Sequence, residues 1–140
     1  MIEKHSLDVL KSAVIIARSS AMKGNDGDKV RVSVLFPYWR EGKHNIGEIY
    51  NANGQTWECY QAYDNAVYPD INPNNAAWHT FNRPLHGNTP DTARAFVPVM
   101  GAHDMYRKGE YAIYDGVIYE CITDTAYSPA TYSGAWSRYE

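Results

Sequence analysis

The chain has 140 residues and a formal net charge of −3 at pH 7, with no block of basic residues. A protein that binds nucleic acid through its phosphates needs clustered Lys and Arg, so this charge argues against nucleic acid as a partner. Nineteen residues are Phe, Trp or Tyr, and twelve of these are Tyr; such a content lets a small unit build its core from few side chains.

Residues 3–21 predict a helix, because apolar side chains recur there at intervals of three and four. Ser6 and Asp8 are placed to cap or favour its first turn, and Lys23-Gly24 to end it. The broad apolar face allows two alternatives for residues 1–24: packing on the rest of the chain, or a short bundle with other copies. The face combines two rows: Leu7, Leu10, Val14, Ala17 and Ala21, and beside them Ile2, Val9, Ala13 and Ile16.

The N-terminal region predicts neither a membrane span nor export. The longest apolar stretch, residues 13–17, is far too short to cross a bilayer. The chain also lacks the basic segment, apolar run and small-residue cleavage site of a signal peptide. We therefore expect synthesis in the cytoplasm without a classical signal peptide and no membrane insertion.

Residues 25–35 predict a linker that continues into a strand or extended tether. Residues 22–29 are polar and rich in Gly, and Asp26 and Asp28 are spaced as in a calcium loop. No Glu follows at the twelfth position of such a loop, so a linker is the favoured interpretation. Residues 30–36 alternate between apolar and polar side chains, as strands do.

The strongest pattern is a direct repeat: residues 47–59 recur as residues 109–121, sixty-two positions later. Inside the copies, Asn53-Gly54 and Asp115-Gly116 are dipeptides that accept the positive φ angles of a type I′ turn. Each copy therefore predicts a tight β-hairpin. The predicted fold class is mainly β: the N-terminal helix, then two small antiparallel β modules built on these hairpins with aromatic cores. The modules span residues 36–83 and 95–140, joined by a linker at residues 84–94.

The second strand of each hairpin carries an aromatic residue and a cysteine on one face, which alternation turns toward the core. These are Trp57 and Cys59 in one copy and Tyr119 and Cys121 in the other. Because the cysteines share one place in the repeat, we expect buried thiols rather than a disulfide or metal ligands. The five His residues form no ligand spacing, so no metal or cofactor is expected. The further aromatic residues assigned to the cores are Trp39 and the two closing tryptophans, Trp78 and Trp136.

Each unit resembles the chitin-binding type 3 module, the carbohydrate-binding family five and twelve. The resemblance rests on an upstream aromatic, a Gly-acidic pair, an Asn/Asp-Gly turn, an aromatic strand residue, a Pro loop and a closing Trp. The first unit supplies Trp39, Gly47-Glu48, Asn53-Gly54, Trp57, Tyr68-Pro69 and Trp78, with His44 where the family usually has Tyr. The second supplies Phe96 as the candidate upstream aromatic, then Tyr106, Gly109-Glu110, Asp115-Gly116, Tyr119, Ser128-Pro129 and Trp136.

The layout of the whole chain is similar to that of small tail-associated proteins of phages and prophages. A helix leads to a Leu-Phe-Pro-x-Trp phrase at residues 35–39, and the second unit is introduced by Gly-Ala-His-Asp-x-Tyr at residues 101–106. This resemblance implies a virion protein made in the host, with a polysaccharide or cell-wall glycan and other virion proteins as partners. It also favours a homo-oligomer formed through the helix.

No constellation in the sequence predicts catalysis. Glu58 and Glu120 repeat, but a glycosidase needs its two carboxylates in one cleft, and these belong to separate units. We therefore expect a non-enzymatic protein. Sugar binding needs only flat aromatic faces with a few polar groups beside them. The residues that we expect to bind carbohydrate are the loop tyrosines Tyr63, Tyr68, Tyr127 and Tyr132.

Each loop tyrosine has an alternative role, because its ring could instead cap a small core or contact another subunit. The chain-level alternative is a structural virion connector or decoration protein that uses the same fold and binds no glycan.

Overall fold

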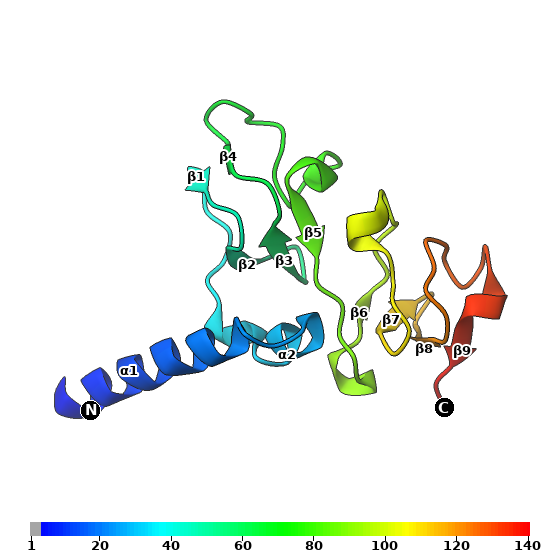
Figure 1. The fold of residues 1–140 in the computed structure, drawn as a ribbon, viewed down its shortest axis with the longest axis horizontal. Helices are drawn as coiled ribbons and strands as arrows, with labels where there is room; N and C mark the ends of the chain where they lie inside the picture. Colours follow the sequence, from blue (N-terminus) through cyan, green and yellow to red (C-terminus); the bar gives the residue numbers. More distant parts are fainter. Residues whose placement is uncertain (1–3) are drawn as a thin grey trace.

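The computed structural model describes residues 4–140 and has a mixed α/β fold, with about 28% helix and 24% strand. A helix comes first and several mostly antiparallel strands follow in three small sheets (Figure 1). The predicted order of helix and strands is confirmed. The expected class, mainly β, overestimates the strand content relative to the helix content. A second helix and several 3-10 turns occupy segments that we expected to be extended or irregular.

Within residues 4–140, nine short strands form the sheets, in the orders β1-β4, β2-β3-β5 and β6-β7-β8-β9. All the pairings between these strands are antiparallel except that of β6 with β7. Their bounds are Lys43–His44 (β1), Ile49–Ala52 (β2), Gln55–Cys59 (β3), Tyr63–Asp64 (β4), Asn82–Pro84 (β5), Arg94–Ala95 (β6), Tyr111–Tyr114 (β7), Val117–Cys121 (β8) and Trp136–Arg138 (β9).

The first helix, α1, spans Lys4–Ala21 and ends before Lys23-Gly24, as predicted. Because Lys4 is already helical, Ser6 and Asp8 lie inside the helix and do not cap it, so that part of the prediction was wrong. The predicted start at Glu3 and the apolar Ile2 lie outside the described residues.

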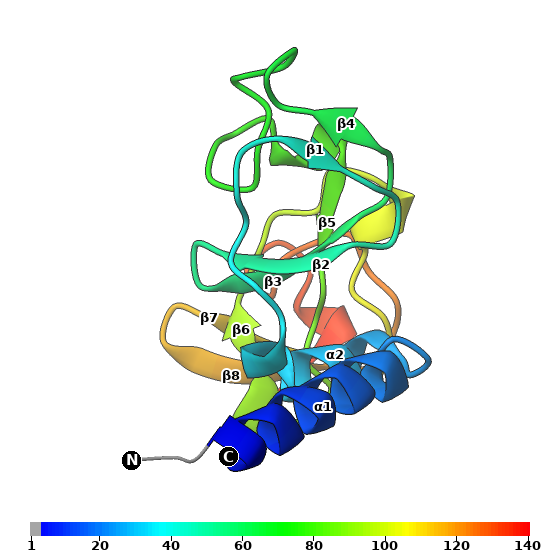
Figure 2. The same ribbon diagram turned by 90° about the vertical axis from the view of Figure 1, so that its left-hand side faces the viewer.

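No residue of α1 is buried, and the helix lies along one edge of the molecule in both views (Figures 1 and 2). Its C-terminal end contacts the 3-10 helix Ser33–Leu35, where the Arg18 side chain donates a hydrogen bond to the carbonyl of Leu35. Most of the apolar side chains of α1 therefore face solvent, among them Leu7, Val9, Leu10, Ile15 and Ile16.

The second helix, α2, spans Asp26–Arg31, where we expected a linker and the start of a strand. The expectation was wrong because Asn25 caps this helix: its side chain accepts from the Asp28 N–H at 2.8 Å, and the Asp28 carboxylate accepts from the Asn25 N–H at 3.2 Å. This reciprocal pair satisfies two of the N–H groups that a helix start leaves free. Residues rich in Asn, Asp and Gly thus begin a helix here rather than forming a flexible linker.

The repeated segments form the two predicted hairpins, β2-β3 and β7-β8. Positive φ angles occur at both turn residues of each copy: 54° and 73° at Asn53 and Gly54, 51° and 77° at Asp115 and Gly116. These signs are those of a type I′ turn. Both copies also close their base with the same bond, from the N–H of Gly47 or Gly109 to the cysteine carbonyl at 2.8 Å. The hairpins are therefore the same local structure.

The similarity extends beyond the hairpins. A third strand pairs with each cysteine strand, β5 with β3 and β9 with β8. On the other edge, Tyr38 forms a parallel bridge with Asn51, just as Ala95 pairs in parallel with Ile113. The following residues, Trp39 and Phe96, each donate their N–H to the carbonyl of that partner. Phe96 therefore occupies in the second unit the place of Trp39 in the first.

Each unit has its own aromatic core, as predicted. The first is the cluster Tyr50, Trp57, Cys59, Tyr63 and Phe81, with Trp39 and Trp78 packed against it. The second is Tyr106, Ala112, Cys121, Ala135 and Trp136, with Phe96 and Tyr119 packed against it.

The two closing tryptophans are not equivalent, contrary to expectation. Trp136 on β9 pairs with Cys121, whereas the residue opposite Cys59 is Asn82. Trp78 instead lies in the preceding 3-10 helix Trp78–Thr80, and its ring packs against Trp57 at a centroid distance of 5.3 Å. The two cores are thus closed from different positions.

The segment that we expected to be the linker between the units, residues 84–94, is largely buried at its start. Leu85 joins Val30, Phe36 and Ile49 in a third apolar cluster, and its N–H donates to the Thr56 carbonyl at 2.8 Å. Two residues on, the Gly87 carbonyl accepts from the Tyr111 N–H of the second unit at 2.9 Å. The connection is therefore packed against both units and α2.

An ionic network holds α2 against the first unit. The Arg83 guanidinium on β5 binds both oxygens of Asp26, at 2.7 and 2.9 Å, and donates to Glu58 on β3 at 2.9 Å. Burial alone would raise the pKa of Asp26, but the hydrogen bonds and charge of Arg83 lower it below its usual value. Lys29 of α2 lies 3.7 Å from the other oxygen of Glu58. The carboxylate of Glu58 is therefore committed to structure.

Candidate functional site

Three of the four tyrosines predicted to bind carbohydrate have exposed side chains: Tyr68 is 46% exposed, Tyr127 57% and Tyr132 51%. Tyr63 is only 6% exposed, so its predicted role as a surface ring was wrong. It lies on β4 and stacks on Phe81 with ring centroids 4.8 Å apart. Its hydroxyl accepts from the Trp39 indole N–H at 2.8 Å. Tyr63 is thus a core residue, and burial raises its pKa.

The exposed tyrosines do not form one surface cluster. Tyr68 belongs to the first unit, where its ring leans on Phe81 at 5.4 Å. Tyr132 lies in the second unit at the start of the 3-10 helix Ser133–Ala135 and covers Gly134. Of the four predicted residues, Tyr127 lines a pocket in the second unit.

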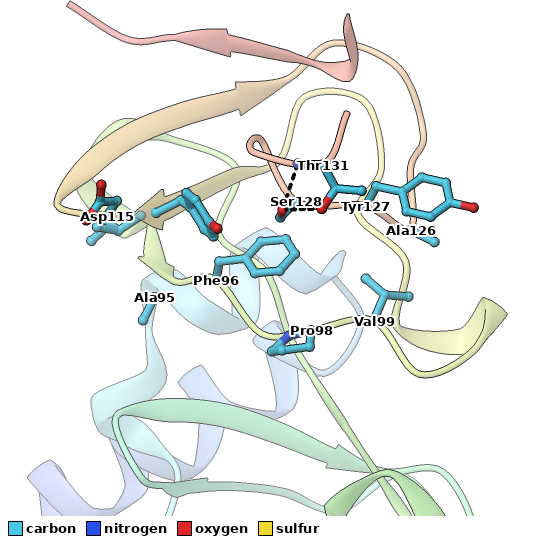
Figure 3. Close-up of a pocket in the computed structure, with 11 residues that line it drawn as sticks. Ala95, Phe96, Pro98, Val99, Asp115, Ala126, Tyr127, Ser128 and Thr131 are labelled. Carbon is cyan, nitrogen blue, oxygen red and sulfur yellow. Dashed lines mark hydrogen bonds between the residues drawn. The ribbon is translucent and has the colours of Figure 1, made fainter. Parts of the chain in front are cut away.

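This pocket, which we name the aromatic pocket, belongs to the second unit and has a volume of about 540 Å³. Figure 3 shows Phe96 near its centre, with Asp115 toward one end and Tyr127 toward the other. Its apolar wall comes from the segment after β6, from the end of β7 and from the loop before β9. The wall consists mainly of Phe96, Pro98, Val99, Ile113, Tyr114 and Tyr127.

The floor of the pocket is rigid because Phe96 belongs to a stack of rings. It lies parallel to Tyr106 with centroids 5.0 Å apart, and Tyr106 in turn stacks on His86 at 3.7 Å. The rings of Tyr114 and Phe96 form an edge-to-face pair, with centroids 5.7 Å apart and an angle of 89° between the ring planes. Such offset and edge-to-face pairs fix ring orientation as well as burying area. The pocket therefore presents a preformed aromatic surface.

Tyr127 is held through its backbone while its ring stays exposed. Its N–H donates to the Thr125 hydroxyl at 3.0 Å, and its carbonyl accepts from the Trp136 indole N–H at 2.9 Å. A Trp of the core thus sets the position of a surface ring. The ring needs little further ordering to bind a ligand, which limits the entropic cost of binding.

Polar groups line the rest of the aromatic pocket. The hydroxyl groups of Ser128 and Thr131 lie 3.1 Å apart, and the Thr131 N–H donates to the Ser128 hydroxyl at 3.1 Å (Figure 3). Asp115, at the hairpin turn, is the charged residue of the lining. Flat rings next to hydroxyl and carboxylate groups match a ligand that has both an apolar face and hydroxyl groups.

Sequence reasoning missed Tyr114 and Ile113 as site residues and placed Phe96 only as an upstream aromatic. The parallel pairing of β6 with β7 brings Phe96 beside Ile113. A two-residue parallel strand leaves no periodic signal in a sequence. The position of Tyr114 directly before the Asp115-Gly116 turn was the available clue.

The repeated glutamates lie outside this pocket. Glu58 binds Arg83, and Glu120 accepts a hydrogen bond from the Tyr111 hydroxyl at 2.7 Å, which helps to raise the pKa of Tyr111 to about 12. Within residues 4–140, no group of three or more His, Cys, Asp or Glu side chains is placed to hold a metal ion. In the same range no helix combines the length and apolar character needed to cross a membrane.

No family model matches this sequence, and no curated protein matches it either.

Proposed function

We propose that this chain is a non-catalytic saccharide-binding protein of a phage particle, which attaches to host cell-surface or cell-wall glycan. The observation that carries the proposal is the aromatic pocket, where an exposed Tyr127 ring stands beside the fixed rings of Phe96 and Tyr114. Its lining contains the combination of flat rings and hydroxyl-binding groups that pyranose rings require.

The pocket lining suggests the binding mode that we propose. In it, the apolar face of a pyranose lies on the Tyr127 ring, and the sugar hydroxyl groups exchange hydrogen bonds with Ser128, Thr131 and Asp115. Because the rings are already in place, the ligand bears most of the ordering cost. One such shallow contact is weak, so several contacts acting together give useful retention.

The placement in a phage particle rests on the resemblance of the whole chain to small tail-associated proteins and to tandem chitin-binding type 3 modules. The repeated hairpins and their separate aromatic cores are compatible with that module type. In this proposal the finer fold assignment is two small carbohydrate-binding-like modules after an N-terminal helix, at residues 36–83 and 95–140.

The test is retention on insoluble chitin and on host cell walls, measured as the fraction of protein pulled down. Tyr127→Ala should weaken binding several-fold to about tenfold and lower the retained fraction accordingly, since stacking on one aromatic ring contributes on the order of 1 kcal/mol. Tyr139→Ala is the matched control: Tyr139 is also an exposed ring of the second unit but does not line the pocket. Equal retention of both variants and of the unchanged chain would reject the proposal.

A second candidate function is architectural: a virion connector or decoration protein that binds no glycan. The observation that favours it is α1, whose apolar side chains face solvent along its length. Such a face is stable when it meets other copies or another virion protein. Oligomerisation through α1 is compatible with both functions, and loss of retention in Tyr127→Ala separates them.

A further inference from the structure

The hairpin turn of the first unit borders a second pocket, of about 310 Å³, which we name the arginine pocket. It stands at the place that corresponds to the aromatic pocket, because Asn51 and Asn53 of its lining are the counterparts of Ile113 and Asp115 in the repeat. Its chemistry is different. The lining includes the polar side chains of Ser33, Asn51, Asn53 and Gln55, and Arg94 is its charged residue.

Arg94 brings a cation into this pocket without an acidic partner. Its guanidinium donates to the Gly54 carbonyl at 2.8 Å and to the Ser33 hydroxyl at 3.0 Å, and both acceptors are neutral. Among residues 4–140, no carboxylate lies within 4.0 Å of it. The side chain is half-buried, and burial lowers its pKa. A partly desolvated guanidinium of this kind gains by binding an oxyanion.

The rest of the pocket supplies groups that suit a sugar. Tyr38 is 79% exposed, which makes its ring one of the most accessible aromatic surfaces of the molecule. Gln55 is buried, and its amide N–H₂ donates to the Ala95 carbonyl at 3.0 Å, so this side chain forms a fixed polar part of the pocket wall. Asn53 is exposed at the turn. An exposed ring, an exposed amide and a guanidinium therefore line one pocket.

We infer that the arginine pocket is a second saccharide site, which binds an anionic sugar with its acidic group at Arg94 and its ring on Tyr38. The planar guanidinium can pair with the two oxygens of a carboxylate or with those of a phosphate or sulfate ester. The counterpart of Asn53 in the aromatic pocket is Asp115, whose negative charge opposes anionic ligands. In this inference the arginine pocket binds anionic sugars, whereas the aromatic pocket disfavours them. The inference rests on the proposed function only for the class of ligand, a saccharide.

The test uses the full chain and calorimetric titration with trigalacturonate, with maltotriose as the neutral control. We expect trigalacturonate to bind and its affinity to fall as salt is raised, because the contact is ionic. Asn53→Asp should weaken this binding about tenfold or more, since it places a carboxylate beside Arg94. The fold tolerates Asp here: Asp115 takes a φ of 51° at the same turn position, close to the 54° of Asn53.

Two further variants separate the sugar site from a simple anion site. Tyr38→Ala removes the exposed ring and should also weaken trigalacturonate, while binding of inorganic phosphate stays as it was. Tyr127→Ala, in the aromatic pocket, should leave trigalacturonate binding unchanged. Trigalacturonate binding that is absent, or that Asn53→Asp leaves intact, overturns the inference. If phosphate and trigalacturonate bind equally well, and Tyr38→Ala does not weaken trigalacturonate binding, the pocket is an anion site and the saccharide part of the inference is overturned.

Failure here and failure of the proposed function give different results. The arginine pocket is tested by comparing trigalacturonate with neutral maltotriose and by Asn53→Asp. The aromatic pocket is tested by chitin retention and by Tyr127→Ala. Arg94→Gln is a poorer variant, because it also removes the bonds to Gly54 and Ser33 that help to join the units.

Discussion

The two cysteine thiols occupy equivalent, fully buried places at the ends of β3 and β8. Each thiol donates to the backbone carbonyl two residues later, Cys59 to Gln61 at 3.1 Å and Cys121 to Thr123 at 3.0 Å. Burial raises the pKa of both thiols, that of Cys121 to about 11. The neutral thiol therefore serves as a small core group with a fixed hydrogen bond, and the expectation of free, buried cysteines is confirmed.

These thiols should be unreactive in the folded protein. At about pH 8, a disulfide reagent such as DTNB should modify neither cysteine until denaturant is added, when both react, because the thiolate is the nucleophile. Stability should also fall as the pH rises from 9 toward 11: the unfolded thiol ionises near 9.0, while the folded Cys121 keeps its proton to about 11. Rapid labelling of the native protein would contradict the burial of these side chains.

At the same scale, exposure of a tyrosine depends on its neighbours more than on its local sequence. Tyr68, Tyr127 and Tyr132 follow loop-forming residues, and their exposure was predicted correctly. Tyr63 also follows a hairpin, but it pairs with His44 across β1 and β4 and turns inward. The strongly exposed Tyr38 was missed, because the phrase around it predicted only a tether.

At the scale of elements, the hairpins were predictable because their turn chemistry is local. Asn-Gly and Asp-Gly specify the twist of a two-residue turn within four residues of sequence. Helix α2 and the parallel strand β6 were not predictable in this way. The helix is fixed by its Asn25 cap and by Val30 entering the third cluster, and the strand by pairing with residues about eighteen positions away.

The turn glycines give a test at this scale. Gly54 and Gly116 have φ angles of 73° and 77°, a region that an L side chain enters at a cost of about 1 kcal/mol. Gly54→Ala and Gly116→Ala should each lower the free energy of unfolding by about that amount in denaturant titrations. Asn53→Gly is the control, because glycine accepts a positive φ freely; a loss as large as that of Gly54→Ala would show that the turn geometry is wrong.

At the scale of the whole molecule, we propose that α1 brings several copies of the chain together. Its exposed apolar face should assemble chains, so that several pockets meet one surface. Leu10→Glu places a charge on this face at a side chain that is already exposed, so the fold of the units should persist while the oligomer dissociates. Sedimentation velocity measures this directly, and Ser19→Glu is the control, because Ser19 is exposed on α1 away from Leu10 and the substitution adds the same charge. A monomeric unchanged chain would contradict the assembly role.

The buried Leu85 also has a consequence for what the protein can hold. This side chain anchors the connection between the repeats in the third cluster, and the Gly87 carbonyl then accepts from Tyr111 of the second unit, so the contacts at both ends of this short segment restrict how far the two units can move apart. A polymer that reaches both pockets of one chain must therefore present suitable sugars within a limited range of spacings. Discrimination between cell walls would then depend on the distance at which suitable sugars repeat along the glycan as much as on which sugars it contains.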